Sequence, residues 1–420
     1  MPIAPHPTRR LTILSLGVLS CLWGAWVSAA EGLSQVLAGH SAMTERLDEA
    51  AQAVRLSPTN PEAHYVRATL LSAREDLSAA TEEYEQAVAL RPKDYALWLE
   101  LGGARDQSGD PEGAIDAFRQ AAHLAPFYAQ PHWQLGNTLY RSGRIDEAVQ
   151  ELRLAAGSNP KLNSQALGMV WPAKGGDAQA IEQAISPRTP STHLALARFL
   201  VKHGKIKEAM QHYRAAGGLS KDQQHELVRD LLASGSFVEA FEVWSASDQT
   251  KRPDGLGHLV SGGFEDPIAL NDPGFGWQLA DNKQAVHLAL DPSRPRDGNY
   301  SLRVDWSGES DASTPVISQL VLVKPKTRYR LSFAARSQEL LTIGLPYVMV
   351  VDAGDETKAV LMKSETLPQG TSEWKDYLAE FTTAETTSAV TISIRRVSCA
   401  TPQCAAFGHV WFDNFSLVRL

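Results

Sequence analysis

Hydrophobic residues follow two different patterns along this chain of 420 residues. As far as Trp244 they form Ala-rich amphipathic stretches, a pattern that predicts helices. From His258 onward, short β-branched and aromatic runs, most of them alternating with polar positions, are divided by turn residues, which predicts strands. The stretch between the two parts has neither pattern. We therefore expect a helical domain at residues 41–247, a linker at 248–257 and an all-β domain at 258–420.

Residues 1–30 form a targeting or anchoring segment. Arg9 and Arg10 precede a run without a charged residue from Leu11 to Ala30, which is long enough to span a bilayer. The two arginines would hold the short N-terminus inside, and Trp23 and Trp26 would lie near the outer interface. This arrangement favours a signal-anchor helix that tethers the protein to the membrane.

Two other interpretations of this segment stay open. Val27-Ser28-Ala29 fits a signal-peptidase site, which predicts a cleaved signal peptide. The stretch from Val18 to Cys21 resembles a bacterial lipobox and would make the chain a lipoprotein. All three interpretations place the rest of the chain outside the cytoplasm, in the periplasm or cell envelope.

The helical part contains a repeat. Pro58, Pro92, Pro126 and Pro160 are each 34 residues apart, and an Ala-rich amphipathic stretch fills every interval. Small residues recur where two helices of a hairpin would cross, and glycines recur where a turn would connect them. In two adjacent intervals these recurring positions are Gly102 and Gly136, Gly109 and Gly143, and Ala114 and Ala148.

These intervals resemble the tetratricopeptide repeat. The match weakens in the unit that ends at Pro92, where His64 replaces a large apolar residue, and between Lys161 and Pro190, where Pro172 and Pro187 interrupt the pattern. The resemblance implies a helical solenoid that binds a protein partner on its concave face. The family's groove positions fall on Tyr65, Trp133, Asn137, Tyr140, Arg141, Arg198 and Lys202. Trp133 and Tyr140 would serve equally as packing between repeats.

The second half contains seven strand-like runs, at residues 300–306, 316–323, 328–335, 347–353, 377–383, 389–397 and 410–418. So many short runs without a helical stretch between them predict a sandwich or jelly roll. Pro325 suits a hairpin turn, and the alternation places Leu331, Phe333, Phe415 and Leu417 in the core.

In order, the segments "GGFEDP", "DGNYSLRV", "QLVLVKPKTRYRLSFAAR", "WKDYLAEFTT" and "VWFDNFSLV" resemble the galactose-binding-like jelly rolls that include many carbohydrate-binding modules. The resemblance implies a glycan ligand and aromatic platforms, for which Trp306, Tyr347 and Trp374 are the candidates. It also implies a structural calcium ion held by Glu265 and Asp413, although Asp413 would equally hydrogen-bond a nearby turn. No other cofactor is expected.

Cys399 and Cys404 are separated by four residues in the loop before the last strand. A zinc site would need two further ligands, and a thioredoxin-like redox pair would need the spacing C-x-x-C. In an oxidising compartment, two cysteines this close tend to form a disulfide. We therefore predict a disulfide that closes the loop.

Charge and missing motifs narrow the function. The 40 Lys and Arg residues against 48 Asp and Glu residues give a net charge of −8 without a dense basic block, which excludes a typical nucleic-acid binder. We find no nucleophile elbow, P-loop, H-E-x-x-H or dinucleotide motif, and we assign no catalytic residue. We expect a non-catalytic binding or scaffold protein near cell-envelope polysaccharide assembly or export. The alternatives are a sandwich that contacts only protein and, less favoured, a glycan-active enzyme.

Overall fold

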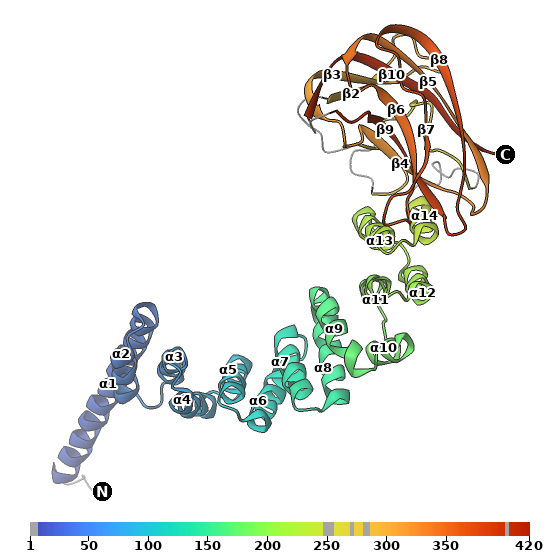
Figure 1. Ribbon diagram of the computed structural model, residues 1–420. Coiled ribbons are helices and arrows are strands. Elements are labelled where there is room, and N and C mark those ends of the chain that lie inside the picture. Colours follow the sequence, from blue (N-terminus) through green and yellow to red (C-terminus); the bar gives the residue numbers. More distant parts are fainter. Residues whose placement is uncertain (1–6, 247–255, 269–272, 280–285, 400–402) are drawn as a thin grey trace, which may run out of the picture. The chain divides into compact units, whose positions relative to one another are not determined.

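The computed structural model describes residues 7–246, 256–268, 273–279, 286–399 and 403–420. The chain divides into two compact units, Met1–Leu196 and Ala197–Leu420. Among the described residues the first unit is helical, and the second contains helices followed by two β-sheets (Figure 1). Of the predicted linker at 248–257, only Leu256 and Gly257 lie inside the described residues.

The first unit is a succession of helices connected by short turns. They are α1 Pro7–Thr44, α2 Leu47–Leu56, α3 Pro61–Ser72, α4 Leu77–Leu90, α5 Tyr95–Gln107, α6 Pro111–Leu124, α7 Ala129–Arg141, α8 Ile145–Ser158, the 3-10 turn η1 Pro160–Leu162, α9 Asn163–Ala173 and α10 Ala178–Ile185. Helix α11 (Pro190–Lys202) contains the division between the units. The second unit continues with α12 Ile206–Ala216, α13 Lys221–Ala233 and α14 Phe237–Ala246.

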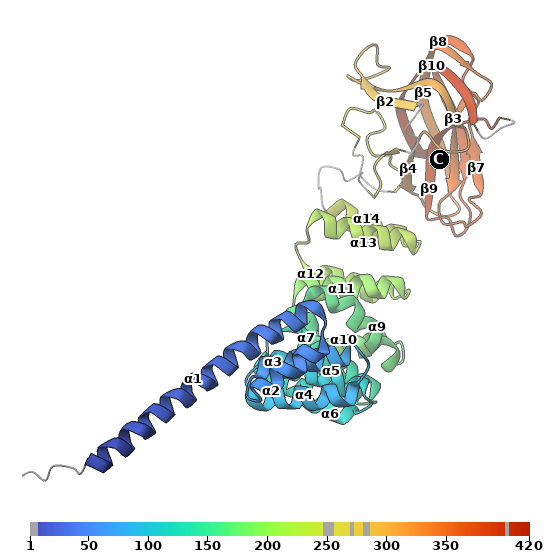
Figure 2. The ribbon, with the colours of Figure 1, turned by 90° about the vertical axis from the view of Figure 1, so that its left-hand side faces the viewer.

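Helix α1 extends well past the predicted targeting segment. Figure 2 shows it as one unbroken helix whose N-terminal part extends away from the other helices of its unit. Its C-terminal part packs on α2 and α3, where Ser34 is fully buried and its hydroxyl donates to the carbonyl of Ala53 at 2.8 Å. Asn60, which caps α3, donates to Ser34 Oγ at 3.0 Å. The apolar helix therefore continues directly into the first helix hairpin.

The predicted roles of the small residues are confirmed in the hairpins α5–α6 and α7–α8. A Cβ atom added to Gly102 would lie 2.5 Å from the ring of Phe118, and one added to Gly136 would lie 2.9 Å from Leu152. Both glycines therefore allow the two helices of a hairpin to approach closely. Gly109, in the turn between α5 and α6, has a φ of +85°, a conformation that favours glycine.

In α3, α5 and α7 a ring nitrogen contacts the carbonyl of the proline that precedes the helix. In α5, Trp98 Nε1 donates to the carbonyl of Pro92 at 2.9 Å. At the same position in α3, His64 Nε2 lies 3.0 Å from the carbonyl of Pro58. The Trp98 ring also packs against a buried cluster that includes Ala117 of α6. The histidine thus takes over the hydrogen bond that the larger indole makes in the neighbouring repeat.

The histidine repeats add an ion pair that the tryptophan repeat lacks. His64 Nδ1 lies 2.6 Å from Glu83, and His132 of α7 makes the same contact with Glu151 at 2.6 Å. In both cases the hydrogen bond with the glutamate raises the pKa of the histidine above its ordinary value. His64, at which the sequence departs from the repeat pattern, is therefore a buried and fully hydrogen-bonded residue.

The second unit ends in a sandwich of two antiparallel five-stranded sheets. The strands are β1 Gln278–Leu279, β2 Val286–Asp291, β3 Ser301–Asp311, β4 Ile317–Leu322, β5 Arg328–Thr342, β6 Pro346–Asp352, β7 Val360–Lys363, β8 Gly370–Thr382, β9 Ala389–Arg396 and β10 Gln403–Arg419. One sheet has the order β1-β4-β9-β6-β7 and the other β2-β3-β10-β5-β8. All seven predicted strand runs are strands; β1, β2 and β7 were not predicted.

Side chains from both sheets fill one core. Leu331, Phe333, Phe415 and Leu417 lie in it, as the alternation predicts. The rings of Phe333 and Phe415 stack with their centroids 5.2 Å apart. This shared core holds the two sheets face to face and fixes which side chains point away from it.

Helix α14 contacts the segment that precedes β1. The ring centroid of Phe275 lies 5.0 Å from that of Phe241 and 5.6 Å from that of Trp244. Gly274 has no room for a side chain, because an added Cβ would lie 2.0 Å from the Trp244 ring. Aromatic packing therefore joins the last helix to the β-domain within the second unit.

The histidine–glutamate pairs should make the stability of the repeats depend on pH. In the folded protein the pKa of each histidine lies above its unfolded value of about 6.5. The pairs therefore stabilise the fold fully below a pH of about 6.5, and this stabilisation is lost as the pH rises through the folded-state pKa. We expect the double variant Glu83→Gln/Glu151→Gln to melt at a lower temperature than the parent, with the difference largest at acidic pH. Thermal melts at several pH values measure this, and Glu82→Gln, at an exposed neighbouring position, is the matched control. A difference that does not change with pH would contradict the prediction.

Candidate functional site

The outward face of the β2-β3-β10-β5-β8 sheet is the face that points away from the shared core. In β10, Val410 and Phe412 are fully buried in that core. Because side chains alternate along a strand, Trp411 between them points to the outward face. The same alternation places Arg303 of β3 there, between the core residues Leu302 and Val304.

Four side chains from four neighbouring strands form a row across this face. The register places Trp411 opposite both Arg303 of β3 and Arg336 of β5. The guanidinium carbon of Arg336 lies 3.7 Å from the centroid of the Trp411 ring and 5.6 Å from that of Trp374 on β8. The guanidinium carbon of Arg303 lies 5.5 Å from the Trp411 centroid. The face of an indole ring attracts a cation electrostatically, so the arginine and tryptophan side chains stabilise one another. We call these four side chains the arginine–tryptophan row.

Asp291 at the end of β2 supports this row. It accepts a hydrogen bond from Trp411 Nε1 at 2.7 Å and another from the backbone N–H of Ser293 at 2.8 Å. Burial opposes ionisation of the carboxyl, but the hydrogen bonds from Ser293 and Trp411 outweigh it and lower the pKa of Asp291. The carboxylate is therefore charged at neutral pH and fixes the orientation of the indole.

Arg336 is the least satisfied member of the row. Only 7% of its surface is exposed, and burial lowers the pKa of its guanidinium. One terminal nitrogen donates to the carbonyl of Ser293 at 3.1 Å. Within the described part of the chain, its Nε has no hydrogen-bond partner and the guanidinium forms no ion pair. This Nε is itself buried, so the contacts of Arg336 with the two indoles hold the row together rather than face solvent.

The row continues along β10 toward an exposed aromatic ring. His409 Nδ1 lies 2.5 Å from Asp305 Oδ1, and Arg303 Nε donates to the same oxygen at 2.7 Å. Beyond them Phe407 is 47% exposed and lies opposite Leu341 of β5, which is 61% exposed. The outward face thus combines an accessible aromatic ring with charged groups that donate and accept hydrogen bonds, the combination used for polyhydroxylated ligands.

The three predicted aromatic platforms do not come together. Trp306 was wrongly assigned to an exposed platform: it is 3% exposed and belongs to the core, because it shares the inward side of β3 with Leu302 and Val304. Tyr347 lies on β6 of the other sheet, where its hydroxyl contacts Met349. Trp374 joins the arginine–tryptophan row, half-buried, and its Nε1 donates to the carbonyl of Arg294 at 3.0 Å.

The two predicted calcium ligands converge on one turn. Glu265 accepts the backbone N–H groups of Asn299 at 2.9 Å and Tyr300 at 3.1 Å. Asp413, which is fully buried, accepts those of Arg296 at 2.9 Å and Asp297 at 3.2 Å, and burial raises the pKa of its carboxyl. Among the described residues, no group of three or more His, Cys, Asp or Glu side chains is arranged to hold a metal. The observed partners are amide donors, as expected for carboxylates that hold a turn, and calcium binding stays a prediction.

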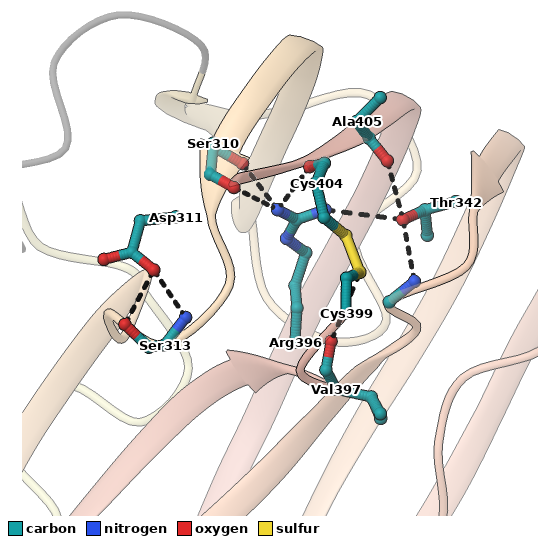
Figure 3. Close-up of a disulfide and its surroundings, with 10 residues drawn as sticks. Ser310, Asp311, Ser313, Thr342, Arg396, Val397, Cys399, Cys404 and Ala405 are labelled. Atoms are coloured by element: carbon teal, nitrogen blue, oxygen red, sulfur yellow. Dashed lines mark hydrogen bonds between the residues drawn. A yellow bond between two sulfur atoms is a disulfide. The ribbon is translucent and has the colours of Figure 1, made fainter. Parts of the chain in front are cut away.

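The predicted disulfide between Cys399 and Cys404 is confirmed (Figure 3). Cys404 is the second residue of β10, which pairs with β3 and β5, so the bridge ties the end of the loop to the centre of a sheet. Gly344 packs directly on it, because an added Cβ would lie 3.0 Å from one sulfur and 3.1 Å from the other.

A buried arginine lies beside the disulfide. Figure 3 shows the guanidinium of Arg396 between Ser310, Cys404 and Thr342. Its Nη2 donates at 2.8 Å to the carbonyls of Ser310 and Cys404. Burial lowers the pKa of this guanidinium. The hydrogen bonds connect β9 to both β3 and β10, and thus join the two sheets at this end of the sandwich.

The predicted groove residues of the first unit have partners within the helices. Tyr65 packs against the clusters on either side of α3, and Tyr140 packs against the cluster formed by α5–α8. Asn137 donates to the carbonyl of Trp133 at 2.9 Å, one turn earlier in α7. Arg141 pairs with Asp106 of α5 at 2.5 Å. These contacts define the residues' positions in the repeats, and their part in peptide binding stays a prediction.

The other two groove residues, Arg198 and Lys202, lie in the second unit. Arg198 forms ion pairs with Glu226 and, at 2.6 Å, with Asp230 of α13. Lys202 Nζ lies 4.0 Å from the same aspartate. Both cations therefore have acidic neighbours in the next helix pair.

Comparisons with known proteins agree with both halves of the fold. Residues 65–129 and 107–169 match two models described as tetratricopeptide repeat, and residues 257–398 match one described as carbohydrate binding domain. The chain thus contains tetratricopeptide repeats and, after them, a segment that matches a carbohydrate binding domain. The matched segment of that domain ends before β10.

The curated relatives named here match the chain over segments of two to three repeats. The Small glutamine-rich tetratricopeptide repeat-containing protein 2 of Mycosarcoma maydis is 35% identical over 75 residues, 18% of this chain and 21% of the relative. The Peroxisomal targeting signal receptor of Candida albicans is 30% identical over 83 residues, 20% of this chain and 14% of the relative. The chain thus spans about a fifth or less of the length of these relatives.

Solved structures resemble each half separately. A CBM4 structure, 15% identical, is covered over 99% of its length by 39% of this chain, with a TM-score of 0.29. The crystal structure of YrrB, a TPR protein with an unusual peptide-binding site, is 17% identical and covered over 90% of its length by 43% of this chain, with a TM-score of 0.33.

Sequence reasoning did not find the central members of the row, Arg303, Arg336 and Trp411. A signal existed, since Trp411 lies between two apolar residues in the closing strand run. Counting back in steps of two from the core residue Phe415, however, places Trp411 in the core. A register shift between Asp413 and Ser416 reverses this phase, and Asn414 there has a φ of +52°.

Removing Arg336 should destabilise the sandwich. Arg336→Ala separates two indoles from the cation between them and leaves a void, for which we expect a loss of roughly 2 kcal/mol in unfolding free energy. Arg330→Ala is the matched control, because Arg330 lies on the same strand in an exposed ion pair with Glu380 and should cost less than about 1 kcal/mol. Thermal and denaturant unfolding followed by tryptophan fluorescence measure both. Equal effects of the two variants would contradict the importance of the row.

Proposed function

We propose that this protein is a non-catalytic, extracytoplasmic binding protein whose sandwich binds a glycan and whose repeats hold a protein partner. The observation that carries the proposal is the outward face of the β2-β3-β10-β5-β8 sheet. There the partly exposed side chains of Arg303, Asp305 and His409 lie on the same face as the exposed ring of Phe407. The match of residues 257–398 to a carbohydrate binding domain supports the same assignment.

The face suits an extended chain of sugars better than a single small molecule. Phe407 and Trp411 are four residues apart on β10, which corresponds to roughly 13 Å at about 3.3 Å per residue. A sugar ring would stack on Phe407, and its neighbours along the chain would offer hydroxyl groups to Arg303, Asp305 and His409. The groups already hydrogen-bond one another, so they are oriented before a ligand arrives.

The membrane tether of the proposal rests on α1. Along its first part the large apolar side chains are exposed, among them Leu19 at 64% and Trp23 at 71%. A helix segment that is apolar on all sides and has no protein partner is suited to a bilayer. One candidate span, Ser15–Thr44, meets the length and hydropathy expected of a membrane helix. The disulfide between Cys399 and Cys404 fits an oxidising compartment outside the cytoplasm.

The protein partner would bind on the first helices of the repeats. The residues proposed for this are Tyr65, Trp133, Asn137, Tyr140 and Arg141 in the first unit and Arg198 and Lys202 in the second. A tethered protein that holds both a partner and a polysaccharide would suit cell-envelope polysaccharide assembly or export. The exposed apolar side chains of Leu341, Ile343 and Phe407 favour one alternative, in which the same end of the sandwich contacts protein and no sugar.

Glycan binding is tested with the full-length protein in detergent. We expect it to be retained on one or more polysaccharide affinity gels or glycan-array spots, and Phe407→Ala to reduce retention at least about tenfold by removing the stacking platform. Leu378→Ala is the matched control, since Leu378 is an exposed apolar residue on β8 of the same sheet. The protein-contact alternative gains support if the parent binds no glycan on a broad array, and that outcome would overturn the sugar assignment.

The tether is tested by membrane extraction. We expect the full-length protein to stay in the membrane pellet after alkaline carbonate treatment, because the large apolar side chains of α1 between Leu16 and Val27 are exposed in the described structure. A variant without residues 11–30 should be released into the soluble fraction. The intact mass of the mature chain provides an independent reading. A mature chain that begins after the Val27–Ala29 site would contradict the anchor and favour a cleaved signal peptide, and an added lipid mass at Cys21 would favour a lipoprotein.

A further inference from the structure

The first unit contains a pocket outside the predicted peptide groove. It has a volume of about 240 Å³ and lies among α8, α9, the end of α10 and the first turn of α11. Leu167 and Ile185 contribute to its buried floor, and Arg153, Arg188 and Thr192 contribute to its polar lining.

The pocket exists because one repeat is irregular. The second helices α4, α6 and α8 of the regular repeats each have 14 residues, whereas α10 has eight. Six missing helical residues correspond to roughly 9 Å at 1.5 Å per residue. The chain leaves α10 through Ser186, in a left-handed conformation with a φ of +48°, and Pro187 follows. Space that a full helix would fill is therefore left open beside α8.

Glycine keeps the wall of this space open. Gly157 of α8 lines the pocket, and an added Cβ there would meet no atom within 4 Å. Gly157 lies in the last turn of α8, and leucine has a higher helix propensity than glycine. A side chain at this position would project into open space, so it offers a direct way to fill the pocket.

The polar lining is positively charged without a counter-charge. None of the lining residues is acidic. In the part of the chain that the structure describes, neither Arg153 nor Arg188 forms an ion pair. Elsewhere in this unit, Arg119 and Arg144 bind Glu147, at 2.9 Å and 2.8 Å. In a chain with a net charge of −8, two unpaired arginines at one pocket are a site of local positive potential.

We propose that this pocket binds a carboxylate carried on a compact apolar group. A cavity of roughly 150 Å³ lined by apolar side chains accommodates benzene, so the larger pocket has room for a phenyl or branched aliphatic group together with its carboxylate. The apolar group lies on Leu167 and Ile185, and Arg153 and Arg188 bind the carboxylate. The ligand is either a free small acid or the last residue of a polypeptide, which present the same chemistry.

N-acetyl-L-phenylalanine is the probe for the free acid, and its amide, N-acetyl-L-phenylalaninamide, is the neutral control. Ligand-observed NMR with the full-length protein in detergent measures binding up to about 10 mM. We expect the acid to bind at least about tenfold more tightly than the amide. A pentapeptide ending in Phe distinguishes the sources. Binding at least as tight as that of the free acid assigns the site to a chain terminus, and much weaker binding assigns it to a free acid.

Two variants test the location and the charge. Gly157→Leu fills the pocket and should abolish binding, whereas Gly168→Leu, which makes the same change on α9 outside the pocket in equally open space, should not. Arg153→Gln/Arg188→Gln keeps the pocket and should weaken binding of the acid about tenfold while leaving the amide unchanged. Circular dichroism confirms that each variant is folded. Equal binding of acid and amide, full binding by Gly157→Leu, or no binding by the parent would each overturn the proposal.

Discussion

Strand β10 lies between β3 and β5, and its side chains alternate between the shared core and the outward face. Val410 and Phe412 point inward, and Trp411 between them points outward. A shift of β10 by one residue would move Val410 and Phe412 out of the core and Trp411 into it, because side chains alternate along a strand with a period of two. The packing that holds the sandwich together therefore also positions the row proposed to bind glycan.

The two buried arginines of the sandwich have different surroundings. Arg396 donates to carbonyl and hydroxyl oxygens of β3 and β10 and closes the end of the sandwich beside the disulfide. Arg336 contacts two indole rings and leaves its Nε without a partner among the described residues. A buried polar group that lacks a partner is costly, so the contacts with the two indoles must offset part of that cost at Arg336. Arg396 is thus held by hydrogen bonds and Arg336 mainly by aromatic rings.

The repeats show how one position tolerates different residues. Trp98 and His64 occupy the same position in their repeats, and a ring nitrogen of each contacts the carbonyl of the preceding proline. The smaller histidine also forms an ion pair with Glu83. The irregular repeat behaves differently, since a shortened α10 leaves a pocket that no side chain fills. Local hydrogen bonds thus accommodate the change from tryptophan to histidine, whereas the loss of helical turns in α10 opens a pocket beside α8.

The sequence by itself determined the elements and their order. The proline spacing, the small residues at Gly102 and Gly136, the seven strand runs and the disulfide all depend on local conformation or on short spacings, which are written directly in the chain. Tertiary structure decided which face of a sheet each side chain lies on. Trp306 lies in the shared core with Leu302 and Val304 of β3. Trp411 lies on the other face of its sheet because the register shift near Asn414 changes the phase of β10, and no local pattern shows such a shift. The pocket beside α8 likewise depends on the length of a neighbouring helix, since a cavity is a property of packed elements and not of any one of them.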